Sequence, residues 1–541
     1  MSSALVDSSI AQPRLDVSAA SRRFPFTGVL SRCQLPLLLL IAAIWMARSP
    51  YSASNLEVPP DSVEYALAPA QVLETGHYQI IVEGRGLPPR YPPWFPLAVI
   101  FPVYALLGAE PGNAILGITF LAVAGVGIAW AIGRRIGGSV GGILAGLGVL
   151  ALPAYSGWAT QVMSDVPCTA LVLGGCWLFL RIRARAGVPQ LLAFWGAGFL
   201  IAVAALFRPV SAAMLLPFAV AAIAPWRVRL ALARTAGLLF PMLGAAAATF
   251  SYNAATFGSP LRNGYHFWSW TESTPLHDFF TLSSVALNWQ MLLRTGLPML
   301  LIICLGVEMA LRRSKSLARK QAAGPLRELV FFVASTGTPM LIFHLFYVYP
   351  CDRFFLPILT GTAIIAGSLL GLQWGQKYQR AIGTAFVALL PLVALARIGV
   401  PDPVPQRRVA ADRIRENTPA DAVVISAIDP AFLEQRVAGH SARRIVPLSR
   451  EVEYTRALFS PQPSAAKDQP TSTGEARRRY LIQFVATEQI DELAKEARQG
   501  RRIFLDTTAL KEDEDSEAFN LVNSRFRMVR KAPALYELEV R

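Results

Sequence analysis

Charged side chains are scarce in this chain of 541 residues, where Asp, Glu, Lys and Arg make up 16% and hydrophobic residues 53%. Soluble globular domains carry about 25% charged residues. A mean hydropathy of +0.40 departs from that class in the same direction. The composition therefore excludes an ordinary soluble protein and favours one that spans a membrane.

Several common sources of chemistry are also missing. The sequence has no Walker motif, no nucleophile elbow and no zinc-ligand spacing. Five cysteines are present without disulfide-framework or metal-ligand spacing, and each lies in or beside an apolar segment: Cys33, Cys168, Cys176, Cys304 and Cys351. We interpret them as packing residues within the membrane part.

Long apolar runs make up most of the first 400 residues. A hydrocarbon layer takes about 20 helical residues, and these runs reach or approach that length: residues 35–47, 114–132, 142–152, 170–180, 191–206, 212–224, 238–250, 291–311, 329–346, 356–370 and 382–396. Residues 94–108 form a shorter run with Pro96 and Pro102, which predicts a juxtamembrane helix at the outer surface. The pattern predicts a polytopic helical bundle of about eleven crossings.

Basic residues gather on one side of these crossings when the amino terminus is placed in the cytoplasm. That side receives Arg134, Arg135, Arg181, Arg183, Arg185, Arg227, Arg229, Arg234, Arg312, Arg313, Lys315, Arg319, Lys320, Lys377 and Arg380. The outer side receives residues 51–93, 154–165, 208–209, 251–290 and 347–353, and everything after residue 400. The net charge of +15 belongs to the membrane part, so it indicates topology and not binding to nucleic acid.

The sequence divides into three regions. Residues 1–32 resemble a disordered cytoplasmic tail, and residues 33–400 form the transmembrane part. In residues 401–541 the apolar runs shorten to strand length, with helical patterns at 411–417, 430–437 and 488–498 between them. The expected strands are 422–428, 444–448, 502–505, 526–529 and 535–540. We predict a mainly α membrane protein with a small extracytoplasmic α/β domain, in which residues 461–474 form a loop.

Two acids at the outer ends of crossings are the first candidates for catalysis. Asp61 follows the first crossing and Asp165 begins the fourth. Ionisable groups beside hydrocarbon are costly and are usually functional or paired. Such a pair suits transfer to a hydroxyl, because one carboxylate takes the proton and the other orients the acceptor or holds a divalent cation. The alternative is that each caps a helix, since prolines lie close to both.

Two arginines on the outer side, where basic residues are otherwise depleted, are candidates for binding a phosphate. They are Arg208 in Phe-Arg-Pro and Arg353 in Asp-Arg-Phe-Phe. The alternatives are structural ion pairs, such as Arg353 with Asp352, and snorkelling to headgroups. The lesser candidates for binding substrate are Glu64, Tyr65, His77, Arg90, Tyr91, Arg262, Tyr265 and His344. Residues 252–270 combine aromatic and polar side chains, which fits either sugar binding or an interfacial aromatic belt.

The ordered succession of these elements resembles the GT-C membrane glycosyltransferases. It consists of an acid after the first helix, Tyr-Pro-Pro before a juxtamembrane helix, Gly-Arg-Arg at an inner turn, then Ser-Asp-Val-Pro, Phe-Arg-Pro, Tyr-Asn-x5-Gly-Ser-Pro-Leu-Arg and Asp-Arg-Phe-Phe-Leu-Pro. The resemblance covers about residues 33–400. It is strongest to the bacterial branch that includes the aminoarabinose transferase for lipid A, and more distant to the protein O-mannosyltransferases.

The resemblance implies that a sugar moves, with inversion, from a polyprenyl-phosphate donor to an acceptor outside the bacterial inner membrane. Asp61 is then the presumed base, Asp165 the second acid, and Arg353 and Arg208 the ligands of the donor phosphate. Mg²⁺ or Mn²⁺ at the two acids is a further expectation. A lipid or glycan acceptor is favoured over a protein, because Ser62 stands where the mannosyltransferases carry a second acid. A transporter or flippase for lipid-linked sugars is the alternative.

Overall fold

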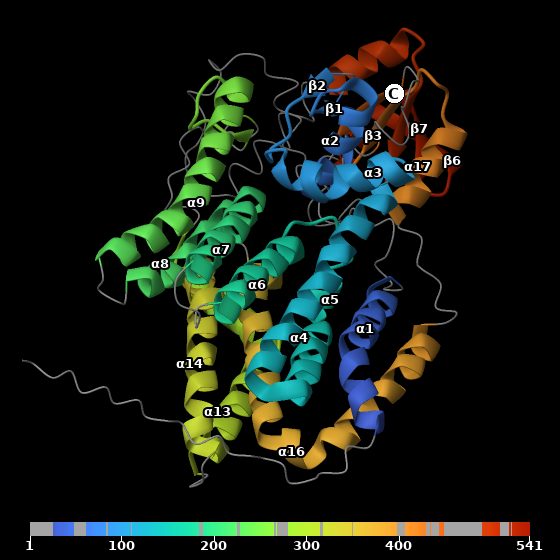
Figure 1. Ribbon diagram of the computed structural model, residues 1–541. Coiled ribbons are helices and arrows are strands. Elements are labelled where there is room, and N and C mark those ends of the chain that lie inside the picture. Colours follow the sequence, from blue (N-terminus) through green and yellow to red (C-terminus); the bar gives the residue numbers. More distant parts are fainter. Residues whose placement is uncertain are drawn as a thin grey trace, which may run out of the picture.

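The computed structural model describes residues 25–47, 61–82, 85–109, 111–182, 188–223, 228–264, 267, 280–313, 318–348, 350–397, 406–428, 433, 443–447, 490–508, 519–520 and 522–541. Within these residues, a bundle of long helices occupies one end of the molecule and a small sheet the other (Figure 1). The apolar composition of the first 400 residues accounts for this division, because only helices satisfy every backbone group within one segment in a hydrocarbon layer.

The bundle contains most of the helices. They are α1 (Pro25–Ala47), α4 (Pro111–Leu150), α5 (Pro153–Trp158), α6 (Asp165–Ile182), α7 (Val188–Phe207), η2 (Pro209–Met214), α8 (Leu215–Ile223), α9 (Val228–Phe257), α12 (Leu282–Arg294), α13 (Leu297–Arg313), α14 (Ala318–Thr336), α15 (Thr338–Leu345), η3 (Asp352–Phe355) and α16 (Leu356–Arg397). Because α1 begins at Pro25, the cytoplasmic tail predicted for residues 1–32 is too long at its carboxyl end. Residues 1–24 lie outside the described residues.

Glycines bring α4 and α16 into close contact. Gly137 and Gly141 of α4 are four residues apart, as are Gly367 and Gly371 of α16. A Cβ atom at Gly371 would come within 2.6 Å of the Gly137 carbonyl oxygen, and one at Gly367 within 2.6 Å of the Ala145 Cα. Small residues at this spacing let two helix backbones approach directly in a membrane.

Four described helical stretches are long and apolar enough to cross a membrane, judged by length and composition: Gly112–Leu150, Arg229–Phe257, Arg327–Leu345 and Asp352–Trp374. Several apolar helices are shorter. The predicted run 114–132 and most of 142–152 lie on two helices that share the label α4 and meet at Gly138, whose φ of 69° is not helical. Likewise, 356–370 and 382–396 both belong to α16. The count of about eleven crossings stays a prediction.

The first outer region is structured. It contains α2 (Asp61–Thr75), the antiparallel pair β1 (Ile80–Val82) and β2 (Arg85–Leu87), η1 (Pro96–Ile100) and α3 (Phe101–Leu107). Gly108, with φ 93°, ends α3. Figure 1 shows α3 lying across the end of α4. The first residues of the outer loop predicted for 251–290 are helical, because α9 continues to Phe257.

The carboxyl-terminal region forms a five-stranded sheet in the order β4-β3-β5-β7-β6. Its elements are α17 (Gln406–Asn417), β3 (Val423–Ser426), β4 (Arg444–Pro447), β5 (Ile503–Asp506), β6 (Phe526–Ala532) and β7 (Leu535–Val540). The strands β4, β3 and β5 run parallel, and β7 and β6 are antiparallel. Each segment expected to be a strand overlaps one of them. Residues 490–498 are helical, as expected; of 430–437 only residue 433 is described, and 461–474 lie outside the described residues.

A shared hydrophobic cluster joins this sheet to the first outer region. It includes Ala66 of α2, Ile100 of η1, Ile414 of α17, Val424 of β3 and Phe504 of β5. In Figure 1, α2, β1 and β2 accordingly lie next to β3 and α17. The carboxyl-terminal region is therefore packed onto the segment that begins with Asp61.

Candidate functional site

Asp61, the first residue of α2, accepts two hydrogen bonds from distant parts of the chain. The Tyr91 hydroxyl donates to Oδ1 at 2.5 Å, and Arg353 Nη2 donates to Oδ2 at 3.3 Å. The Asp61 side chain is 17% exposed and that of Arg353 14%. Arg353 therefore pairs with Asp61 and not with its neighbour Asp352, whose carboxylate accepts a bond from the Trp158 indole at 2.8 Å.

Asp165 and Arg208 form a second ion pair. Asp165 is the first residue of α6 and its side chain is fully buried, whereas Arg208 immediately precedes Pro209, the first residue of η2. A carboxylate at a helix amino terminus is favoured by the helix dipole. Asp165 thus lies at the start of a helix, where the alternative interpretation as a helix cap also places it. It also binds Arg208, which lies at the start of a different helix.

The ring of Phe354 lies between the two pairs. The guanidinium carbon of Arg353 is 4.9 Å from the Phe354 centroid, and that of Arg208 is 5.1 Å from it. His344 stacks on the same ring at 5.0 Å with an interplanar angle of 11°. Trp158 also contacts Arg353, at 5.5 Å. Asp61 and Asp165, 104 positions apart, are thereby brought into one neighbourhood.

All four charged residues lie at or beside helix ends. Asp61 and Asp165 each open a helix, Arg208 precedes η2, and Arg353 lies in η3 just before α16. Prolines beside three of these positions favour a helix start there, because the fixed φ of proline suits the first turn. The sequence therefore places its polar chemistry where the long helices stop.

Arg353 retains donors for a further partner. Among the residues that the structure describes, its Nε is buried with no hydrogen-bond partner, and Nη1 meets the Met163 thioether sulfur at 3.6 Å. Thioether sulfur is a weak acceptor. A guanidinium can bind a phosphate through two parallel N–H groups, so this side chain can hold Asp61 and an anionic ligand at once.

A buried ion pair lies next to Asp61. Glu64 and Arg90 are 0% and 5% exposed, and Glu64 accepts bonds from Arg90 Nε at 2.9 Å and from the Arg90 backbone N–H at 2.6 Å. Tyr65, also buried, packs its ring 4.6 Å from that of Tyr91. These residues, candidates for binding substrate, contact one another within the protein interior.

The remaining candidates are distributed differently. Arg262 and His77 are exposed, and Tyr265 lies outside the described residues. The sequence reasoning missed Phe354 and Trp158. Phe354 directly follows Arg353 in the Asp-Arg-Phe-Phe motif, and this adjacency to a candidate arginine is the feature of the sequence that could have identified it.

A divalent cation does not fit the donor set at the two acids. Asp61 and Asp165 each already face a guanidinium, which takes the place of a cation. Within the described residues, no group of three or more His, Cys, Asp or Glu side chains could hold a metal ion.

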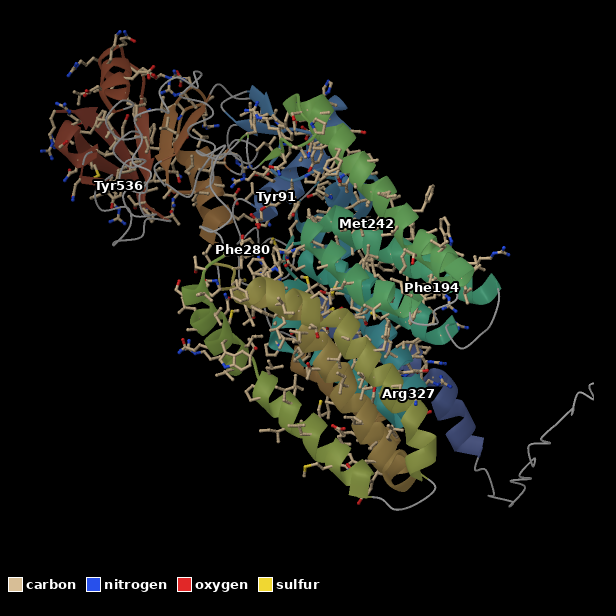
Figure 2. The ribbon with its side chains drawn as sticks, turned by 90° about the vertical axis from the view of Figure 1, so that its left-hand side faces the viewer. Tyr91, Phe194, Met242, Phe280, Arg327 and Tyr536 are labelled. Carbon is tan, nitrogen blue, oxygen red and sulfur yellow. The ribbon has the colours of Figure 1, made fainter. Side chains whose placement is uncertain are left out.

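The basic end of the bundle lies away from this site. Arg135 of α4 pairs with Glu328 of α14 at 2.9 Å. Figure 2 labels Arg327, the neighbour of Glu328, well away from Tyr91 along the bundle. The acid–arginine pairs and the predicted cytoplasmic arginines are therefore separated along the bundle.

Known proteins resemble the chain in part of its sequence and in its fold. Residues 92–252 match the family described as Dolichyl-phosphate-mannose-protein mannosyltransferase. No curated protein matches the sequence. The fold is similar to ArnT from Cupriavidus metallidurans, in the apo state and bound to undecaprenyl phosphate, with a TM-score of 0.56, 13% identity, and coverage of 95% of this chain and 97% of that one.

A further similarity, with a TM-score of 0.49 and 14% identity, is to the archaeal oligosaccharyltransferase AglB from Archaeoglobus fulgidus, covering 92% of this chain and 71% of that one. Because the chain is only 13% identical to ArnT, this similarity establishes the fold alone. The resemblance to the GT-C membrane glycosyltransferases drawn from the sequence is confirmed: the chain has their fold.

Proposed function

We propose that this protein is a membrane glycosyltransferase that moves a sugar from a polyprenyl-phosphate donor to a hydroxyl group of an extracytoplasmic lipid or glycan. The observation that carries the proposal is the meeting of two acid–arginine pairs, Asp61 with Arg353 and Asp165 with Arg208, on the ring of Phe354. The GT-C fold and the match to a dolichyl-phosphate-mannose family support the same class of donor.

The donor phosphate binds at the two arginines. Arg353 offers its unpartnered Nε, and Arg208 adds a second fixed cation across Phe354. Arginine suits this role because its planar fork matches the geometry of phosphate oxygens. Asp165 keeps Arg208 oriented through its buried carboxylate.

The transfer is a single displacement. The acceptor oxygen forms a bond to the anomeric carbon while the bond from that carbon to the donor phosphate oxygen breaks. The electron pair of the broken bond leaves with polyprenyl phosphate, whose growing charge the arginines stabilise. The acceptor proton passes to a carboxylate oxygen of Asp61. Attack opposite the leaving oxygen inverts the anomeric configuration.

Asp61 is placed to act as the base. Its two oxygens use one lone pair each for Tyr91 and Arg353, and an ionised carboxylate has about four acceptor positions. At least one position per oxygen therefore remains for the acceptor hydroxyl. Tyr91 fixes the plane of the carboxylate and so fixes where that position points.

The membrane setting follows from the donor. Burying a methylene group contributes about 0.8 kcal/mol, so a polyprenyl chain keeps the donor in the bilayer. The site lies at the end of the bundle away from the Arg135–Glu328 pair, which supports an extracytoplasmic orientation under the positive-inside rule. The carboxyl-terminal sheet packs on α2, and we assign acceptor recognition to it.

A transfer assay tests the proposal. Purified protein is incubated with radiolabelled polyprenyl-phosphate sugars and a membrane lipid extract, and the products are separated by thin-layer chromatography. We expect label in a new product of inverted anomeric configuration with the native chain and none with Asp61→Asn. Label that crosses vesicle membranes while it stays on its carrier would identify a flippase and overturn the proposal.

A further inference from the structure

The inference concerns Glu64 and Arg90, and it rests on the proposed function. We infer that this buried ion pair, together with Gly264 of the segment after α9, is a positioning device that holds the Tyr91 hydroxyl against Asp61. Each of the three residues acts through Tyr91.

The Glu64 carboxylate binds residue 90 at two points. One oxygen accepts the bond from Arg90 Nε at 2.9 Å, and the other accepts the backbone N–H at 2.6 Å. The backbone bond fixes the peptide between residues 89 and 90, which lies one residue before the peptide that joins Arg90 to Tyr91. Glu64 also lies three residues after Asp61 on α2, so both acids share one turn of helix. A single rigid element therefore carries Asp61 and the residue that fixes the position of Tyr91.

Tyr91 is constrained on its other sides as well. Tyr78 donates to the Tyr91 carbonyl oxygen at 3.2 Å, and the Tyr65 ring packs 4.6 Å from the Tyr91 ring. Burial raises the pKa of Tyr78 well above its ordinary value, so this phenol remains a neutral donor at physiological pH. The Tyr91 hydroxyl, held in this way, meets Asp61 at 2.5 Å.

Gly264 lies against the carbonyl side of Arg90, the side that joins it to Tyr91. A Cβ atom at this position would lie within 2.6 Å of the Arg90 carbonyl carbon and 2.5 Å of its Cα. Backbone atoms cannot move aside as a flexible side chain can. The segment after α9 thus lies directly against residue 90, and a side chain at position 264 would displace the residue that precedes Tyr91.

The experiment measures epistasis with Tyr91→Phe in the transfer assay. Glu64→Gln and Gly264→Ala should each lower kcat at least about tenfold, because small displacements of a catalytic group are costly, while the KM for the donor stays within about twofold. In the Tyr91→Phe background the same substitutions should add little further loss. The inference is overturned if the losses of kcat in the double variants equal the products of the losses in the single variants. It is also overturned if Glu64→Gln and Gly264→Ala change only the KM for the donor.

Matched controls exclude general damage. Glu74→Gln changes an exposed glutamate on the same helix, and Gly244→Ala fills open space in α9. Both should retain native kcat. Where Glu64→Gln fails to accumulate as folded protein, Gly264→Ala carries the test alone, since it alters no charge.

A second readout does not need turnover. Nitration of membrane preparations by tetranitromethane, mapped by mass spectrometry, reports how accessible the Tyr91 ring is. Tyr91 should be protected in the native chain and in Glu74→Gln, and nitrated several-fold faster in Glu64→Gln and Gly264→Ala. Should the native chain transfer no sugar, the proposed function fails and nitration alone decides the positioning device. Equal nitration in all four proteins overturns it.

Discussion

Asp61 and Arg353 lie 292 positions apart in the sequence, yet Arg353 Nη2 donates to Asp61 Oδ2 at 3.3 Å. One residue opens the first outer helix and the other precedes the last long helix of the bundle. Their contact joins the beginning and the end of the membrane part of the chain. The acid of the candidate site comes from the first of these segments and the cation from the second.

Asp61→Asn should abolish transfer. The amide cannot take up the acceptor proton, so we expect kcat to fall by a factor on the order of 10² to 10⁴. Expression and thermal unfolding should be unchanged. The control is Asp491→Asn, which alters a two-thirds exposed carboxylate near the carboxyl-terminal sheet. Native turnover in Asp61→Asn would remove the base from the mechanism.

Arg353→Ala should weaken donor binding. Loss of a charge-assisted bond to a phosphate costs roughly 1.5–3 kcal/mol, which corresponds to about a tenfold to hundredfold increase in donor KM. Arg353→Lys should recover only part of it, because an ammonium group cannot bind two phosphate oxygens in parallel. Initial rates over a donor titration measure this. The control is Arg415→Ala, which changes an exposed arginine on α17. An unaltered donor KM in Arg353→Ala would exclude binding of the donor phosphate by Arg353.

Gly371→Val should destabilise the bundle. The added side chain meets the Gly137 and Gly141 backbones, and overpacking of this kind costs roughly 2 kcal/mol. We expect a lower unfolding temperature in detergent. Gly306→Val in α13, where the space is open, should change it little. Equal stability of the two variants would show that α4 and α16 do not need this close approach.

Glu537 gives the carboxyl-terminal sheet a pH-dependent contribution to stability. Hydrogen bonds from Arg502, and then from Lys531, lower the pKa of Glu537 to about 2, against about 4.3 in an unfolded chain. The stabilisation is therefore complete above the unfolded pKa and is lost as the pH falls toward 2. The unfolding temperature of Glu537→Gln should lie below that of the native chain at pH 7, and the gap should narrow by pH 3. A constant gap would contradict this assignment.

Charge and hydropathy were enough to predict the class of fold and the approximate positions of the strands, because those properties depend on local composition, whereas the roles of the site residues stay predictions. Arg208 and Arg353 stood out because basic residues are depleted around them. The partner of each could not be read from the sequence, since pairing of Arg353 with Asp61 in place of Asp352 depends on how the bundle closes. The continuity of α16 through Lys377 was likewise missed, because a basic residue between two apolar runs also signals a turn.

The most direct test of the central claim is a structure of the protein with undecaprenyl phosphate bound. We predict that phosphate oxygens lie within hydrogen-bond distance of both Arg353 and Arg208, with the phosphorus atom close to the ring of Phe354 and Asp61 within reach of the adjoining space. A phosphate bound elsewhere, with both acid–arginine pairs undisturbed and shielded from it, would contradict the account.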